Sequence, residues 1–220
     1  MRFPAHLEFH EVTPDRWPDF ERLFEARGGP KHCWCVVFRT IDRNDTTAAT
    51  KKTAMRARVA AGTPIGVLGY LDGEPIAWCS VAPKATFERL GEVEDDTADP
   101  DTLWSITCFF VPRPYRGHGI TAYLIKAAVT HAKAHGARVV EAYPVDPSSP
   151  SYRFMGFVPA FERERFREAG RAGTRRHIYR RHLRTTPRNL RDNETGGAVW
   201  LRLFDRLVAG EGFEPPTFGL

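Results

Sequence analysis

The sequence has few sulfur-containing residues and no long apolar run. Its 220 residues include four cysteines and three methionines. No apolar run approaches the roughly 18 residues that span a bilayer, and residues 1–10 lack the apolar centre of a secretory leader. The Gly-x-Gly-x-x-Gly and Gly-Lys-Ser/Thr patterns of dinucleotide and nucleoside triphosphate sites are also missing. We therefore expect a protein of the reducing cytoplasm with no membrane partner.

The cysteines do not form a metal-binding pattern. Cys33 and Cys35 flank Trp34 and follow His32, but no second pair with ligand spacing occurs, and structural zinc usually needs four ligands. Cys108 has no evident partner base for a nucleophilic role. We interpret these cysteines as small buried hydrophobic residues and expect no metal.

Composition and charge indicate one domain with an anionic partner. A hydrophobic content of 42% is enough for one sizeable core, which we assign to residues 1–183. Residues 184–220 are interpreted as a linker and tail, either dispensable or a readthrough artefact, because Gly212-Phe213-Glu214-Pro215 back-translates to a motif resembling the T-arm of a transfer-RNA gene. The net charge of +5 favours an anionic ligand. The arginine-rich stretch 171–184 alternates like a solvated edge strand, so we expect no nucleic acid partner.

The most informative stretch is 111–120, Val-Pro-Arg-Pro-Tyr-Arg-Gly-His-Gly-Ile. The β-branched and aromatic run before it, 103–111, predicts a buried strand that Pro112 ends. Residues 119–135 carry apolar positions at helical spacing, and Gly136 supplies a stop. The start of a helix exposes unpaired amides and the positive end of its dipole, and glycines allow close approach of the backbone. The stretch therefore predicts a phosphate-binding loop.

Arg116-Gly117-His118-Gly119-Ile120-Thr121 resembles the Arg/Gln-x-x-Gly-x-Gly/Ala signature of the GCN5-related N-acetyltransferases (GNAT). Thr121 departs from it, since the family prefers Gly or Ala there. Further pieces resemble a bacterial subgroup whose substrate is unknown; they are residues 33–35, 78–83, 104–111 and 143–147. The resemblance covers about residues 7–183, and its specificity comes from the order of these pieces.

The resemblance implies an α/β (α+β) fold with a central mixed, mostly antiparallel sheet flanked by helices. An acyl-CoA cleft is expected where strands 103–111 and 137–142 splay apart. The sequence itself predicts a first strand at 7–12, helices from Thr13 and from Asp45 or Thr46, and a hairpin of 65–71 with 75–81 turning at Asp72-Gly73. The acidic run 92–101 is interpreted as a solvated loop.

Two segments compete for the junction between the last helix and the last hairpin. Tyr152-Arg153-Phe154-Met155-Gly156-Phe157 matches the family's Tyr-x-x-x-Gly-Phe literally, while residues 161–166 repeat its spacing with Phe and Arg in place of Tyr and Gly. We favour the second as the junction, because a better hairpin, 166–183, follows it. Residues 148–156 then form an inserted loop near the cleft.

The resemblance further implies direct transfer of an acetyl group from acetyl-CoA to a primary amine of a small molecule or peptide. The implied cofactor-binding residues are Phe110, Val111, Arg116, Gly117, His118, Gly119, Ile120 and Thr121. Phe110 or Val111 would supply an amide to the thioester carbonyl. For the base, water relayed by Ser105 or Thr107 competes with Glu141, and Tyr152 is the candidate acid. The alternatives left open are a non-catalytic acyl-CoA sensing module, and a monomer or a homodimer.

Overall fold

A computed structural model describes residues 7–39, 46–94 and 96–183. The strands are β1 (Leu7–Glu11), β2 (Gly66–Leu71), β3 (Glu74–Pro83), β4 (Leu103–Phe110), β5 (Val139–Ala142), β6 (Arg167–Ala172) and β7 (Arg176–His182). The α-helices are α1 (Trp17–Glu25), α2 (Ala48–Ala60), α3 (Ile120–Ala134) and α4 (Val158–Arg163). The expectations for the tail, 184–220, lie outside the described residues.

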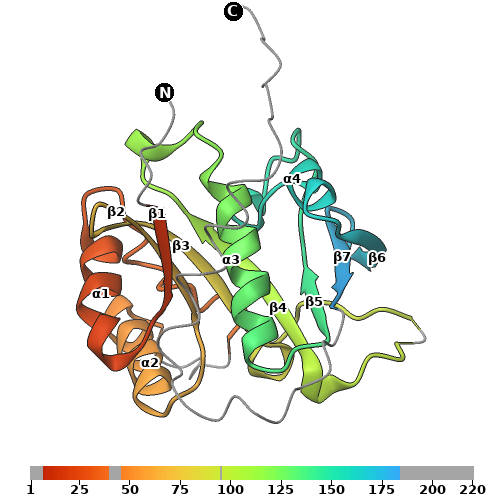
Figure 1. Cartoon of the computed structure of the whole chain (residues 1–220), viewed down its shortest axis with the longest axis horizontal. Coiled ribbons are helices and arrows are strands. Elements are labelled where there is room, and N and C mark those ends of the chain that lie inside the picture. Colours follow the sequence, from red (N-terminus) through yellow and green to blue (C-terminus); the bar gives the residue numbers. More distant parts are fainter. Residues whose placement is uncertain (1–6, 40–45, 95, 184–220) are drawn as a thin grey trace, which may run out of the picture. The chain divides into compact units, whose positions relative to one another are not determined.

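The strands form one seven-stranded sheet in the order β1-β2-β3-β4-β5-β7-β6. Neighbouring strands are antiparallel except for β4 and β5, which run parallel. Helices cover both faces of the sheet, as Figure 1 shows. The predicted mixed, mostly antiparallel sheet flanked by helices is confirmed.

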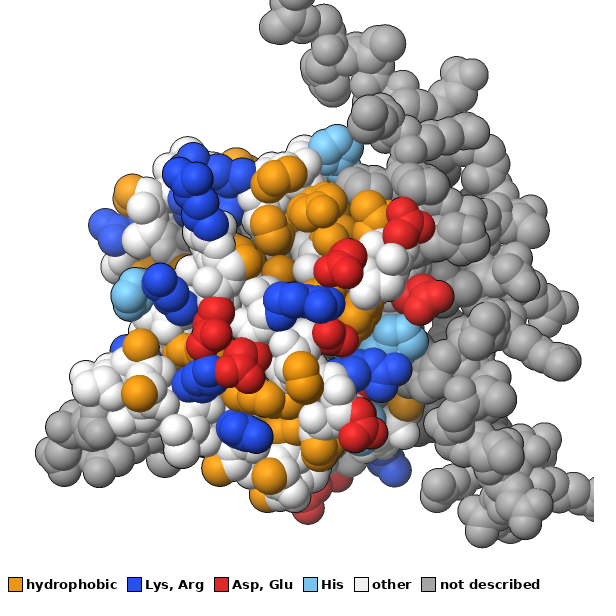
Figure 2. Space-filling view, turned by 90° about the vertical axis from the view of Figure 1, so that its left-hand side faces the viewer, with side chains coloured by type: hydrophobic (Ala, Val, Ile, Leu, Met, Phe, Trp, Pro, Cys, Tyr) orange, Lys and Arg blue, Asp and Glu red, His pale blue; other side chains and the backbone are white. Residues whose placement is uncertain are grey.

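Each face of the sheet has its own hydrophobic core, because successive strand residues point to opposite sides. Cys79 packs with Leu124 and Ala128 of α3 on one face. On the other face, Trp78 packs with Phe20 and Phe24 of α1, and the Phe20 and Trp78 ring centroids lie 4.7 Å apart. On the side of the molecule that carries α1 and α2, acidic and basic side chains are intermingled (Figure 2). No helix among the described residues is both long and apolar enough to cross a membrane.

The parallel pairing of β4 with β5 stops halfway along β4. Its register runs from Leu103 opposite Val139 to Ile106 opposite Ala142. Residues 108–110 of β4 therefore pair only with β3, and beyond β5 Val145 forms bridges to Phe157 and Arg176 and not to β4. The predicted splay between these two strands is confirmed.

Two predicted helix starts are shifted by a few residues. A 3₁₀ turn, Pro14–Arg16, precedes α1, so the α-helix begins at Trp17. Helix α2 begins at Ala48, because the hydroxyl of Thr47 caps it by accepting a hydrogen bond from the amide of Thr50 at 3.2 Å. The helix predicted from Asp45 or Thr46 therefore exists, but it begins later than predicted.

The C-terminal segment confirms one prediction and corrects another. Helix α4 and β6 meet at residues 161–166, where Arg165 takes the left-handed conformation (φ 64°) usually adopted by glycine. The preferred junction is therefore confirmed. The edge-strand interpretation was wrong, since β7 lies between β5 and β6. Arg180 on β7 is 7% exposed and donates hydrogen bonds to the carboxylates of Glu141 and Asp96. These carboxylates neutralise its charge, so an arginine can occupy a strand inside the sheet.

Candidate active site

A cavity of about 630 Å³ lies beside the C-terminal half of β4. Four segments line it: the end of β4, the start of α3, a loop after α1 and the loop before α4. The lining residues are Pro30, Cys33, Cys35, Val37, Phe38, Thr107, Cys108, Phe109, Phe110, Val111, Arg116, Thr121, Arg153, Phe154 and Phe157. We call this cavity the acyl pocket. It lies where β4 has lost its β5 neighbour, so the splay of the two strands creates it.

A β-bulge sets the orientation of the pocket floor. Ser80 of β3 faces Cys108, whereas Val81 faces Ile106, so Thr107 is the extra residue on β4. Bulges re-aim side chains and are frequent next to active sites. The Thr107 hydroxyl is buried and donates a hydrogen bond to Ser80 Oγ at 3.0 Å. Ser105, the other candidate for a water relay, is fully buried, lies 3.3 Å from the Tyr143 hydroxyl and does not line the acyl pocket.

The loop before α3 has the properties of a phosphate site. Gly117 and Gly119 adopt φ values of 80° and 76°, and a Cβ built on either would meet no atom within 4 Å. Open space therefore lies in front of both residues. The amides of Gly117, Gly119 and Thr121 bond to no acceptor among the described residues. Free amides at the positive end of a 15-residue helix fit a pyrophosphate group.

The remaining predicted cofactor residues divide into two groups. Phe110, Val111, Arg116 and Thr121 line the acyl pocket, and Arg116 Nε donates to the Val111 carbonyl at 2.7 Å, which holds the loop against the end of β4. The Val111 amide has no acceptor among the described residues. His118 is exposed, while the side chain of Ile120 is 2% exposed and belongs to the core beneath α3. Any contact of Ile120 with a cofactor would therefore involve its amide.

Sequence reasoning missed one pocket wall. Cys33 and Cys35 line the acyl pocket, whereas Trp34 between them packs in the core against Phe24. Left-handed backbone at Trp34 (φ 49°) and Cys35 (φ 53°) produces this reversal, and no glycine in the segment signals it. The expected inserted loop does reach the cleft, because Arg153 and Phe154 form the opposite wall.

Two of the pocket thiols touch. Cys35 Sγ lies 3.1 Å from Cys108 Sγ and 3.2 Å from Trp78 Nε1. Its hydrogen bonds with the Cys108 thiol and with the Trp78 indole hold the pKa of Cys35 below its usual range, against the effect of burial. The contact with Cys35 and burial raise the pKa of Cys108. Cys108 is therefore held as a neutral thiol, which agrees with its interpretation as a packing residue.

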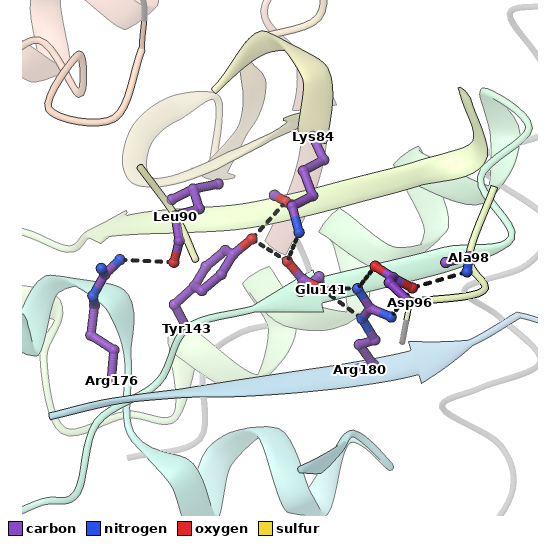
Figure 3. Close-up of polar contacts among 9 residues, drawn as sticks. Lys84, Leu90, Asp96, Ala98, Glu141, Tyr143, Arg176 and Arg180 are labelled. Atoms are coloured by element: carbon purple, nitrogen blue, oxygen red, sulfur yellow. Dashed lines mark hydrogen bonds and ion pairs between the residues drawn. The ribbon is translucent and has the colours of Figure 1, made fainter. Parts of the chain in front are cut away.

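Glu141 lies in a buried network outside the lining of the acyl pocket. Its side chain is fully buried and accepts hydrogen bonds from the Tyr143 hydroxyl and from Arg180 Nε, the latter at 2.6 Å. Lys84 Nζ forms an ion pair with it at 2.8 Å. Figure 3 shows these groups converging on one carboxylate. Burial and the Glu141 charge raise the pKa of Tyr143 well above its usual range.

The network extends into the acidic run. Arg180 donates through a second nitrogen to Asp96 at 2.6 Å, and this hydrogen bond lowers the pKa of Asp96 to about 2. At this position the acidic run is therefore fixed to β7, which departs from the expected solvated loop.

Tyr152 stands next to the acyl pocket. It has left-handed backbone (φ 57°) and a 38% exposed side chain, and the Arg176 guanidinium lies 5.3 Å from its ring centre. Its neighbours Arg153 and Phe154 line the pocket, while Tyr152 itself does not. The structure therefore does not bring the two predicted catalytic residues, Tyr152 and Glu141, together in the pocket lining.

One cluster among the described residues has potential metal ligands. Glu11, His131 and His135 place ligand atoms within 4.8 Å of one another. His131 and His135 stand one turn apart on α3, and their rings pack against Trp104. None of the three lines the acyl pocket, so a metal bound here would not take part in chemistry there.

Solved structures share this fold. The aminoglycoside acetyltransferase AAC(6')-Ib, solved with paromomycin and acetyl-CoA, is 14% identical, with a TM-score of 0.53 over 81% of this chain and 94% of that chain. The structure of its complex with ribostamycin and coenzyme A is 17% identical, with a TM-score of 0.53, again over 81% of this chain and 94% of that chain. An uncharacterised protein from Bacillus halodurans gives 13% identity and a TM-score of 0.51 over 80% and 83% of the two chains. No match is found among curated proteins.

At such identities the structural likeness concerns the fold alone. The family assignment comes from the sequence, in which residues 9–157 match the model of the Acetyltransferase (GNAT) family. That match spans the strands, the glycine loop and the helix that surround the acyl pocket. The chain belongs to the GNAT acetyltransferase family.

Proposed function

We propose that this protein transfers an acetyl group directly from acetyl-CoA to a primary amine of a small molecule or peptide. The observation that carries the proposal is the loop of Gly117 and Gly119, which faces open space at the mouth of an apolar pocket and whose amides bond to no described residue. The complexes of AAC(6')-Ib with acetyl-CoA or coenzyme A, on the same fold, support this donor.

The amides of residues 117–121 would hold the pyrophosphate, and the unpaired edge of residues 107–110 would accept the pantetheine arm as an added strand. The Val111 amide, which bonds to no acceptor among the described residues, would donate to the thioester oxygen as charge develops there. Aromatic side chains around this point exclude water from the thioester.

The acceptor amine must lose a proton, and the departing thiolate must gain one. Thr107 is the relay candidate that lines the acyl pocket, so we propose that a water bound to its hydroxyl takes the amine proton. Glu141 is the second candidate, since Tyr143 and Ser105 form a chain of hydroxyls leading to its carboxylate. Tyr152 is the proposed acid, because its side chain is partly exposed and the next residues along the chain, Arg153 and Phe154, line the pocket.

The test is release of coenzyme A thiol from acetyl-CoA across a panel of amino acids, polyamines, aminoglycosides and N-terminal peptides. We expect acceptor-dependent release, with the acetylated amine identified by mass. A Gly119→Val substitution should raise the KM for acetyl-CoA at least tenfold, since a branched side chain at φ 76° would distort the loop and cover its amides. Thermal stabilisation by acetyl-CoA without release for any amine would instead support a non-catalytic acyl-CoA sensing module.

A further inference from the structure

Arg39 is a buried arginine with no carboxylate partner among the described residues. Its side chain is 2% exposed, and one guanidinium nitrogen donates to the Ile65 carbonyl at 2.8 Å and to Ser80 Oγ at 3.1 Å. The Nε and Nη1 atoms are buried and have no acceptor among the described residues. Buried donors are almost always paired, so two unpaired donors on one cation mark a place for an anion.

The electrostatics support this interpretation. Burial and the nearby charge of Arg58 together lower the pKa of Arg39 to about 9. The Phe87 ring, 4.3 Å from the guanidinium carbon, compensates the charge only in part. A bound anion would supply the missing counter-charge, and a carboxylate would match the planar fork of the guanidinium.

Arg39 lines a second cavity, of about 420 Å³, which also contains His32, Lys51 and Arg89. Lys51 Nζ donates to the His32 carbonyl at 3.1 Å, and Arg89 donates to the Val37 carbonyl at 3.2 Å. Neither cation pairs with a carboxylate in the part of the chain that the structure describes. This cavity, which we call the cationic subsite, therefore carries positive charge from three side chains.

The cationic subsite adjoins the acyl pocket. Cys33 and Val37 line both cavities. Ser80 Oγ connects them as well, since it accepts hydrogen bonds from Arg39 and, at 3.0 Å, from Thr107 on the pocket floor. An anionic group at Arg39 would therefore lie close to the place where the acceptor amine must react.

The acyl pocket itself favours an apolar body over a polycation. Its lining includes the rings of Phe109, Phe154 and Phe157, and its charged members are Arg116 and Arg153, with no Asp or Glu among the described lining residues. A polyamine or aminoglycoside would have to place several ammonium groups here without partners, and burial of unpaired charge is strongly unfavourable.

We propose, on the basis of the proposed function, that the acceptor is an amino acid with an aromatic or aliphatic side chain. Its carboxylate binds Arg39, with Lys51 and Arg89 contributing charge, and its side chain packs against Phe109 and Phe154. The deprotonated α-amino nitrogen attacks the thioester carbonyl, so that a C–N bond forms and the C–S bond breaks. Coenzyme A leaves as the thiolate and takes up a proton, while the amine proton passes to the base.

The test compares acceptors that differ only in the carboxylate. L-phenylalanine is assayed against its methyl ester and against phenethylamine, with kanamycin and spermidine as polycations. We expect kcat/KM for L-phenylalanine to exceed that for the ester, phenethylamine and both polycations at least tenfold, and L-leucine to behave like L-phenylalanine. Equal rates with acid and ester, or a preference for a polycation, would overturn the proposal while leaving amine acetylation intact.

Variants locate the anion site. Arg39→Met should raise the KM for L-phenylalanine at least tenfold and should raise the KM for acetyl-CoA much less. Since Arg39 is buried, the double variant Lys51→Ala/Arg89→Ala offers a second test, with an expected three- to tenfold rise in that KM. Lys52→Ala is the matched control, because Lys52 follows Lys51 on α2 but pairs with Glu25 at 2.7 Å. An unchanged KM in the double variant refutes the subsite, whereas the absence of any acetylated amine refutes the proposed function instead.

Discussion

Replacing Glu141 by glutamine tests whether this buried carboxylate holds the sheet together or serves as the base. The substitution keeps the side-chain volume and removes the charge that Lys84 and Arg180 face at 2.8 and 2.6 Å. Removing one member of a buried ion pair costs about 3–5 kcal/mol, because the partner charge stays buried. The lower end is expected, since the Lys84 side chain is 20% exposed and Arg180 keeps Asp96.

A loss of about 3 kcal/mol corresponds to a fall in Tm of about 6–12 °C for a domain of this size. Thermal unfolding followed by circular dichroism measures it, and kcat is measured well below the Tm of the variant. Glu74→Gln is the control, because Glu74 is 69% exposed and lies 3.4 Å from Arg22, so its loss should change stability by less than about 1 kcal/mol.

A double-mutant cycle with Lys84→Met separates pairing from other effects. If Glu141 stabilises the fold through Lys84, the double variant should be less destabilised than the sum of the single variants by at least about 1 kcal/mol. A Glu141→Gln protein with the parental Tm, a greatly reduced kcat and no titrating acid limb in its rate profile would refute this reasoning and identify Glu141 as the base.

Three further substitutions test other parts of the site. The pKa of Asp96 is about 2 in the folded chain against 3.8 ordinarily, so its protonation should lower the free energy of unfolding as pH falls from about 4 to 2. Urea titrations across this pH range should show the fall in the parent protein and a smaller fall in Asp96→Asn. In Gly156→Ala the free energy of unfolding should fall by about 1–3 kcal/mol and the acceptor KM should rise, because the new Cβ would lie 2.9 Å from Phe161 and 3.2 Å from Phe109. In Gly173→Ala the new Cβ would meet nothing within 4 Å, so the free energy of unfolding should fall by about 1 kcal/mol through backbone strain alone. Tyr152→Phe should lower kcat at least tenfold with little change in KM for acetyl-CoA, and unchanged turnover at all pH values would remove Tyr152 from the acid role.

Local patterns predicted the elements that are determined by nearby residues. Asp72-Gly73 indicated a hairpin, and both residues adopt positive φ (52° and 81°), as a tight turn requires. The strand, glycine loop and helix around residues 103–135 follow in the same way from proline, glycine and apolar spacing. The repeated motif at 161–166 was placed correctly because the hairpin after it is regular, even though Arg165 occupies a left-handed position.

Contacts between distant segments were not predictable from such patterns. Lys84, Asp96, Glu141 and Arg180 come from four separate segments, and only the sheet order brings them together. Taken alone, Arg180 looked like a charge on an edge strand. The reversal at Trp34 and Cys35 was hidden for a related reason, since its left-handed residues are held by aromatic packing from α1 and not by glycine.

Two buried arginines show how the same residue type can serve different ends. Arg180 lies between the carboxylates of Asp96 and Glu141, and the hydrogen bond to Asp96 and the charge of Glu141 raise its pKa. Arg39 is buried to a similar degree, 2% against 7% exposed, yet no carboxylate among the described residues reaches it, and its pKa falls. The first guanidinium is neutralised by the protein itself and belongs to the scaffold. The second has unmet hydrogen-bonding capacity beside the acyl pocket, so the difference between them is the strongest reason to seek an acceptor that carries its own anion.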